Sequence, residues 1–303
     1  MKDIYIVETP LQLICAYEII NKSKKEYILL LRCSGVGRND AQMEFGAKLL
    51  RLKYRKIFIR PNSVYIDTIK ELINFSDIIF SRFDRIYIGS YFSRFIMSIA
   101  KVIRSNKRFL LDDGVATLLA QKKMAEKGVV YDLATFFNIK LLPGQNKITH
   151  SFEKIRDNFN LDHTAKSIFI GQILVERNFL TLDEYVALVE NAKSRVSGDF
   201  IYIPHRAESK KTTAEISKIK GINVEYSETC IELHLLTKGI YPENIFSSVS
   251  SAIFSLSAIF PNSKIHSLIH ENINASNSPH FQDILDALSD KKNVSIEWLK
   301  FDT

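Results

Sequence analysis

Residues 199–206 read Asp-Phe-Ile-Tyr-Ile-Pro-His-Arg, an apolar run that ends in a proline and two basic residues. The β-branched and aromatic side chains of Phe200 to Ile203 are typical of a buried strand, and Pro204 cannot donate a hydrogen bond to a strand ladder. We therefore expect His205 and Arg206 to lie just beyond the carboxyl end of this strand. Open α/β sheets bind their ligands at that edge.

The segment that follows this strand is rich in cationic groups. An imidazole and a guanidinium are followed by the ammonium groups of Lys210 and Lys211. Such groups favour the binding of an anion, phosphate above all. A basic turn that only faces water is the alternative, because charged runs usually do.

The composition of the chain indicates a globular protein. It has 303 residues, of which 46% are hydrophobic and 25% charged, so it can form two α/β domains of ordinary size. The net charge of +7 is spread along the chain without a long Lys/Arg block. This distribution disfavours nucleic-acid binding and leaves anionic substrates or an anionic membrane surface open.

Cysteine usage and the N-terminal segment predict a cytoplasmic protein. Three cysteines, none in a CxxC pair, argue against a disulfide framework or a structural zinc site and fit a reducing compartment. Glu8 interrupts the apolar run that a signal peptide would need, and no stretch approaches the roughly 20 apolar residues that span a bilayer. Peripheral attachment to the inner face of the membrane and a homodimer both stay open.

Strand and helix patterns alternate along the chain, which predicts mostly parallel sheets with helices on both faces. In the first half the expected strands are Ile4 to Val7, Tyr27 to Leu31, Ile57 to Ile59, Arg85 to Gly89 and Arg108 to Leu111. The periodicity fades between about Leu142 and Thr164, and a strand at Ser167 to Ile170 opens the second half. We expect one domain over residues 1–155 and another over 156–303.

Two carboxylates, Asp112 and Asp113, directly follow the strand that ends at Leu111, and Gly114 comes next. They are expected at the ligand-binding edge of a sheet, where carboxylates suit general acid–base chemistry. Capping of a helix is the alternative, because the dipole favours aspartate at a helix start and glycine eases the turn. Taken alone, the pattern favours capping.

Ser250 and Ser251 stand where a strand feeds a helix. Their hydroxyls and the free amides of the first helical turn could hold a phosphate. Serine is also the ordinary residue at the start of a helix, and this is the alternative.

These features combine into a pattern. The His205-Arg206 edge, Glu232 and the Ser250-Ser251 helix start fall at successive junctions of the second half, and together they could form a nucleotide pocket. The Asp112-Asp113-Gly114 edge lies in the first half, as if it faced that pocket across a cleft. Two Rossmann-like domains with the reaction in the cleft between them form the GT-B arrangement of glycosyltransferases.

The chain resembles bacterial sialyltransferases, in particular the lipooligosaccharide sialyltransferases of glycosyltransferase family 52 and the related capsule polysialyltransferases. Those enzymes carry an acidic-acidic-Gly motif, a His-Pro motif and a Ser-Ser/Thr motif in this order. The corresponding segments here are Asp112-Asp113-Gly114, Pro204-His205-Arg206-Ala207-Glu208 and Ser250-Ser251. Further likenesses are Thr9-Pro10-Leu11-Gln12, Ile170-Gly171-Gln172 and Ile231-Glu232-Leu233. The main departure is Arg206, where the family has proline.

The resemblance implies transfer of sialic acid from CMP-sialic acid to a hydroxyl, with inversion and without a metal or other cofactor. The acceptor would be a bacterial surface glycan, with galactose as the receiving sugar in a lipooligosaccharide, a capsule or an O-antigen. The domain over residues 1–155 would face the acceptor, and the domain over 156–303 would bind the CMP-sugar. A CMP-sugar has one phosphate, and the sequence has neither a P-loop nor a DxD metal motif.

The resemblance also implies roles for individual residues. Asp112 or Asp113 would be the general base, and each carboxylate could raise the pKa of the other if the two lie close together. His205 would stabilise or protonate the CMP phosphate, Ser250 and Ser251 would hydrogen-bond it, and Glu232 would hold the cytidine. The other implied substrate-binding positions are Pro10, Gln12, Gly114, Gly171, Gln172 and Arg206.

Two other functions stay open. The first is another GT-B transferase that uses a different CMP- or UDP-sugar, since the residues at the edge of the predicted nucleotide pocket do not recognise the sugar. A non-catalytic nucleotide- or glycan-binding protein is the second, although binding alone does not need an aspartate pair opposite a histidine. No known nucleic-acid-binding motif is present.

Overall fold

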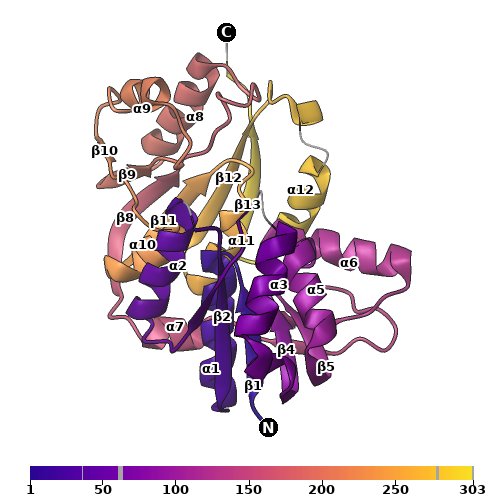
Figure 1. The fold of residues 1–303 in the computed structure, drawn as a ribbon. Helices are drawn as coiled ribbons and strands as arrows, with labels where there is room; N and C mark the ends of the chain where they lie inside the picture. Colours follow the sequence, from indigo (N-terminus) through magenta and orange to yellow (C-terminus); the bar gives the residue numbers. More distant parts are fainter. Residues whose placement is uncertain (36, 61–63, 278–279, 302–303) are drawn as a thin grey trace. The chain divides into compact units, whose positions relative to one another are not determined.

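The computed structural model describes residues 1–35, 37–60, 64–277 and 280–301. The chain divides into two compact units, Met1–Asn158 (unit 1) and Phe159–Thr303 (unit 2), each built on its own sheet (Figure 1). The sequence predicted a boundary between residues 155 and 156. None of the helices in the described ranges combines the length and the apolar character needed to cross a membrane.

Unit 1 contains a seven-stranded sheet in the order β3-β2-β1-β4-β5-β6-β7, with parallel pairing between all neighbours. Its strands are β1 (Asp3–Val7), β2 (Tyr27–Cys33), β3 (Arg55–Phe58), β4 (Arg82–Ile88), β5 (Arg104–Leu111), β6 (Asp132–Thr135) and β7 (Lys147–Thr149). Its helices are α1 (Pro10–Ser23), α2 (Arg38–Leu49), α3 (Val64–Asn74), α4 (Ser76–Ile79), α5 (Arg94–Val102), α6 (Val115–Lys127) and α7 (Glu153–Asp157).

Both faces of β1 are buried, which explains its unbroken apolar sequence. Ile4 and Ile6 belong to a core cluster that also contains Ile96 of α5 and Met124 of α6. Tyr5 points to the opposite face, because successive side chains of a strand alternate, and its ring stacks on that of Tyr87 with centroids 4.4 Å apart. α5 and α6 therefore cover the face of the sheet that carries Ile4 and Ile6.

Unit 2 contains a six-stranded parallel sheet in the order β10-β9-β8-β11-β12-β13. Its strands are β8 (Asp162–Ile170), β9 (Phe200–Ile203), β10 (Ile222–Val224), β11 (Ile240–Ser247), β12 (Lys264–His270) and β13 (Val294–Leu299). Its helices are α8 (Leu182–Ser194), α9 (Lys210–Ile216), α10 (Ile231–Thr237), α11 (Ala252–Ile259), α12 (Phe281–Ser289) and the short 3₁₀ helix η2 (Ala275–Asn277).

The strand over Phe200 to Ile203 has the predicted bounds and is buried along its whole length. Phe200 and Tyr202 pack in a core cluster with Tyr185 and Leu188 of α8. Two parallel sheets, each flanked by helices, confirm the predicted fold of two Rossmann-like domains.

Some predicted strand bounds were wrong. β5 begins at Arg104 and not at Arg108, because its first residues are polar and exposed but still pair with β4. β8 begins at Asp162 and not at Ser167. β7 lies in the segment where the sequence predicted no regular structure, since three residues are too few to show a periodicity.

Candidate functional site

In unit 1, three neighbouring strands bring the predicted catalytic segments to one edge of the sheet. β1 pairs with β4, and β4 pairs with β5. Thr9 follows β1, Ser90 follows β4, and the two aspartates follow β5. Because carboxyl ends of parallel strands share one edge, these polar groups lie where an open α/β sheet binds its ligand.

Asp112 is held inside the protein. It has no exposed surface. Its Oδ1 accepts a hydrogen bond from the Thr135 hydroxyl at 2.7 Å, and its Oδ2 accepts one from the backbone N–H of Phe136, also at 2.7 Å. Helix α6 begins at Val115, and its N-cap residue is Gly114 with no side-chain cap, so the capping alternative is wrong for both aspartates. Asp112 joins the end of β5 to the end of β6.

Asp113, in contrast, is only half-buried. Its backbone N–H donates to the Thr117 hydroxyl at 2.8 Å, and its Oδ1 accepts a long hydrogen bond from the Thr9 hydroxyl at 3.4 Å. Burial raises the pKa of Asp113, and the side chain of Gln12 acts in the opposite direction. A negative charge that raises the Asp113 pKa further is that of Glu8.

The segment Pro10 to Gln12 positions the start of α1 beside Asp113. Thr9 caps α1 by accepting from the Gln12 backbone N–H, and Pro10 occupies the first turn, which needs no N–H donor. The Gln12 side chain is fully buried, and its Oε1 accepts from the backbone N–H of Glu8 at 2.8 Å. Glycine is required at position 89, because a Cβ there would overlap the Gln12 amide.

Beneath Asp113 lies a group that the sequence did not predict. Cys15, Asp112 and His150 are all buried, and each offers one ligand atom within 4.8 Å of the others. The His150 Nε2 lies 3.5 Å from the Asp112 Oδ2, and neither ring nitrogen of His150 has a hydrogen bond. Cys15 lies in α1, Asp112 follows β5 and His150 follows β7, so no local spacing in the sequence could have revealed them.

In unit 2, His205 lies in a tight turn after β9. Its backbone N–H donates to the Glu208 Oε2 at 3.0 Å, and its ring Nδ1 accepts from the backbone N–H of Ala207 at 3.1 Å. Burial lowers the pKa of His205, and the charge of Arg206 lowers it further. These features favour a neutral ring that carries its proton on Nε2, because Nδ1 is the acceptor.

Arg206 is exposed. Within the described part of the chain, its guanidinium makes no hydrogen bond or ion pair. This matches the expectation of a solvated side chain, and its role toward a ligand stays a prediction.

A buried chain of hydroxyl groups links this turn to the loop after β8. The Tyr202 hydroxyl donates to the Glu208 Oε1 at 2.6 Å and lies 3.0 Å from the Tyr185 hydroxyl. The Tyr185 hydroxyl in turn accepts from the backbone N–H of Gln172 at 2.9 Å. Burial raises the pKa of Glu208 to about 7, although the Tyr202 and His205 hydrogen bonds oppose the shift.

Gln172 then ties the loop after β8 to the serine-rich loop after β11. Its Oε1 accepts from the backbone N–H of Ser248 at 3.0 Å and from the Ser247 hydroxyl at 3.3 Å. Its Nε2 donates to the Val249 carbonyl at 2.9 Å. The side chain therefore fixes the backbone directly before Ser250.

The serine pair precedes α11, and Glu232 contacts that same helix. Ser251 is the exposed N-cap residue of α11, and its side chain makes no capping hydrogen bond. The Ser250 hydroxyl accepts weakly from the Ala252 N–H at 3.3 Å. The buried Glu232, in the first turn of α10, accepts from the Ser255 hydroxyl of α11 at 2.5 Å. Glu232 thus anchors α10 against the first turns of α11.

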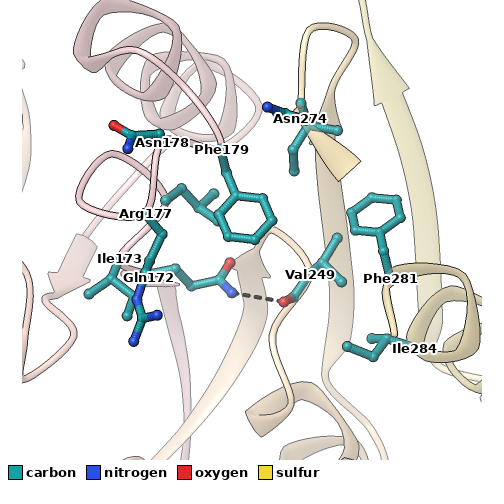
Figure 2. A pocket seen from close by; sticks show the side chains of 11 residues that line it. Gln172, Ile173, Arg177, Asn178, Phe179, Val249, Asn274, Phe281 and Ile284 are labelled. Carbon is teal, nitrogen blue, oxygen red and sulfur yellow. Dashed lines mark hydrogen bonds between the residues drawn. The ribbon is translucent and has the colours of Figure 1, made fainter. Parts of the chain in front are cut away.

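A cavity of about 700 Å³ opens beside this loop, lined by Gln172, Val249 and residues that follow β8 and β12. It lies at the topological switch point between β8 and β11, from which the later strands are added to the sheet in opposite directions. In Figure 2 the rings of Phe179 and Phe281 flank it, and the Gln172 amide reaches the Val249 carbonyl. Pockets of this size and mixed polarity hold small molecules.

No protein-family model and no curated protein matches the chain. Several solved structures share its fold. The UDP-GlcNAc 2-epimerase from Methanocaldococcus jannaschii matches with a TM-score of 0.55 at 13% identity, over 97% of this chain and 94% of that chain. The heptosyltransferase WaaC from E. coli, solved with ADP, matches with a TM-score of 0.53 at 9% identity, over 99% and 94%.

MurG from Acinetobacter baumannii matches with a TM-score of 0.51 at 10% identity, over 98% of this chain and 86% of that chain. At such identities the likeness shows the fold alone. The fold is the two-domain GT-B type, which transferases and an epimerase both use.

Proposed function

We propose that the chain is an inverting, metal-independent sialyltransferase that moves sialic acid from CMP-sialic acid to a hydroxyl of a bacterial surface glycan, with galactose as the receiving sugar. The observation that carries the proposal is the hydrogen-bonded edge of unit 2. His205, Gln172 and the Ser247–Ser251 loop follow neighbouring strands and are joined through Glu208, Tyr202 and Tyr185. In each unit the motifs of the resemblance follow the carboxyl ends of parallel strands, which supports the proposal.

In this mechanism Asp113 is the base. It takes the proton from the acceptor hydroxyl, whose oxygen bonds to the anomeric carbon of sialic acid while the bond from that carbon to the CMP oxygen breaks. A raised pKa suits this task, because a base works best when its pKa lies near the operating pH. Asp112 is the less suitable base, since both of its oxygens already accept hydrogen bonds inside the protein.

The departing phosphate gains negative charge as the bond breaks. The Nε2–H of His205 would donate to this phosphate, and the Ser250 and Ser251 hydroxyls with the first amides of α11 would hydrogen-bond it. The cavity beside Val249 would take a further part of the donor. Glu232 would act on the nucleoside side through its hydrogen bond with Ser255, which holds the start of α11.

A second candidate is a GT-B transferase with a different CMP-sugar or a UDP-sugar. It is favoured by the solved structures of similar fold, which include heptosyltransferase with ADP and MnaA with UDP from S. aureus. A non-catalytic nucleotide- or glycan-binding protein is a third, although it leaves the raised pKa of Asp113 without a use.

A donor panel separates these functions. We would measure nucleotide release from CMP-sialic acid, other CMP-sugars, UDP-sugars and ADP-heptose, each with and without galactose-ended glycans. Acceptor-dependent release of CMP from CMP-sialic acid is the expected result. Turnover of a UDP- or ADP-sugar alone would replace this proposal with the second candidate, and nucleotide binding without any turnover would favour the third.

A further inference from the structure

Unit 1 carries an exposed patch that combines cations with apolar side chains. A hollow of about 400 Å³ is lined by residues that include Phe80, Arg82, Lys101, Val102, Arg104 and Arg108, here called the Phe80 patch. β4 begins at Arg82, β5 begins at Arg104, and α5 ends at Val102. The patch therefore lies at the amino ends of β4 and β5, at the edge of the sheet opposite to Asp113.

The charge of the patch is not balanced by neighbouring carboxylates. Its lining includes four cations and no acidic residue. Other basic residues of unit 1 form ion pairs, such as Lys25 with Asp84 at 2.6 Å and Arg55 with Asp77 at 2.7 Å. Within the described ranges, none of the four patch cations lies within ion-pair distance of a carboxylate. Four such charges around one hollow favour an anionic ligand.

Two apolar side chains extend from the same patch into solvent. Phe80 is 80% exposed and Val102 is 48% exposed. Exposed apolar groups bordered by cations are typical of an interaction surface. At a membrane surface, aromatic and aliphatic side chains enter the boundary between headgroups and acyl chains, while Arg and Lys bind the phosphates.

We propose that the Phe80 patch binds the surface of a membrane that contains anionic phospholipid. Headgroup phosphates would enter the hollow between the four cations, and Phe80 and Val102 would enter the lipid boundary. Single-stranded RNA is the less suitable partner. Proteins that bind it use a groove with several aromatic rings on which the bases stack, and this patch has one ring. The proposal does not depend on the proposed reaction.

Vesicle flotation with the full chain tests the proposal. We expect binding to vesicles of phosphatidylcholine with phosphatidylglycerol, at least about tenfold stronger than binding to phosphatidylcholine alone, and weakened by salt. The double variant Arg104→Glu/Arg108→Glu should lose about tenfold or more. Its control, Lys220→Glu/Lys292→Glu, makes the same charge change at exposed lysines of unit 2 and should bind like the wild type.

The apolar part is tested in the same assay. Phe80→Ser should weaken binding several-fold, while Tyr226→Ser, which removes a 69% exposed ring in unit 2, should not. Circular dichroism would show that each variant is folded. Equal loss of vesicle binding in both charge-reversal variants would show that binding depends only on net charge, and it would overturn the proposal. Binding of RNA or inorganic phosphate at the patch, without vesicle binding, would overturn it as well.

Discussion

The carboxylate of Glu208 occupies the space where a side chain at Gly171 would begin. A Cβ on Gly171 would lie 2.5 Å from the Glu208 Oε2 and 3.0 Å from the Pro204 Cα. The loop after β8 and the turn after β9 can approach this closely only because residue 171 has no side chain. This contact holds Gln172 and His205 on neighbouring loops at one edge of the sheet.

Gly171→Ala should destabilise the protein by about 1–3 kcal/mol, because the methyl group overpacks a buried contact. The measurement is the free energy of unfolding in urea. In a Glu208→Ala background the same change should be less destabilising, since the nearest atom is gone. A Gly171→Ala protein as stable as the wild type would show that the two loops separate easily.

Asp113→Asn should lower turnover by about 10²- to 10⁴-fold in a folded protein, because it removes the proposed base. Asp112→Asn should instead lower the melting temperature, because an amide nitrogen would face one of two donors that now bond to the carboxylate. Steady-state kinetics and thermal unfolding of both variants decide the assignment. Loss of turnover at wild-type stability in Asp112→Asn alone would make Asp112 the base.

Stability should depend on pH through Glu208. Its folded-state pKa is raised from 4.5 to about 7, so the folded protein holds this proton more tightly than the unfolded chain does. That contribution to stability is fully present below about pH 4.5 and is lost as pH rises through about 7. Relative to the wild type, Glu208→Gln should therefore become more stable as pH rises from 5 to 8. A difference that does not change with pH would contradict the shifted pKa.

Turnover should survive excess EDTA, because the proposed phosphate contacts are protein groups. The cluster of Cys15, Asp112 and His150 is a candidate metal site, and the same experiment tests whether activity depends on it. If EDTA abolishes activity and Mg²⁺ or Zn²⁺ restores it, the mechanism without a metal is wrong. Measurement of bound metal in the wild type and in Cys15→Ala would then show whether this cluster holds the ion.

His205→Ala should lower the turnover of CMP-sialic acid more than the affinity for CMP, since charge on the phosphate grows only toward the transition state. Arg206→Ala should change little, because the side chain is exposed. A Michaelis constant for the donor raised about tenfold in Arg206→Ala would show that this arginine binds the donor. Unchanged turnover in His205→Ala would remove the phosphate-binding edge from the mechanism.

The apolar runs of the chain determined the fold class. The strand over Phe200 to Ile203 is where the sequence predicts it, since a buried parallel strand depends on residues close together in the chain. β5 was predicted too short, because its polar first half is held by pairing with β4 and not by burial.

The sequence placed Asp112 and Asp113 at a strand end, but it could not distinguish them. Only the tertiary structure decided that Asp112 is bonded to Thr135 and Phe136, residues more than twenty positions away, while Asp113 stays half-buried. The same holds for the links from Gln172 to Ser248 and from Glu208 to Tyr202. A side chain's partners across a sheet are set by strand order, and strand order arises from the packing of the whole domain, which no local pattern records.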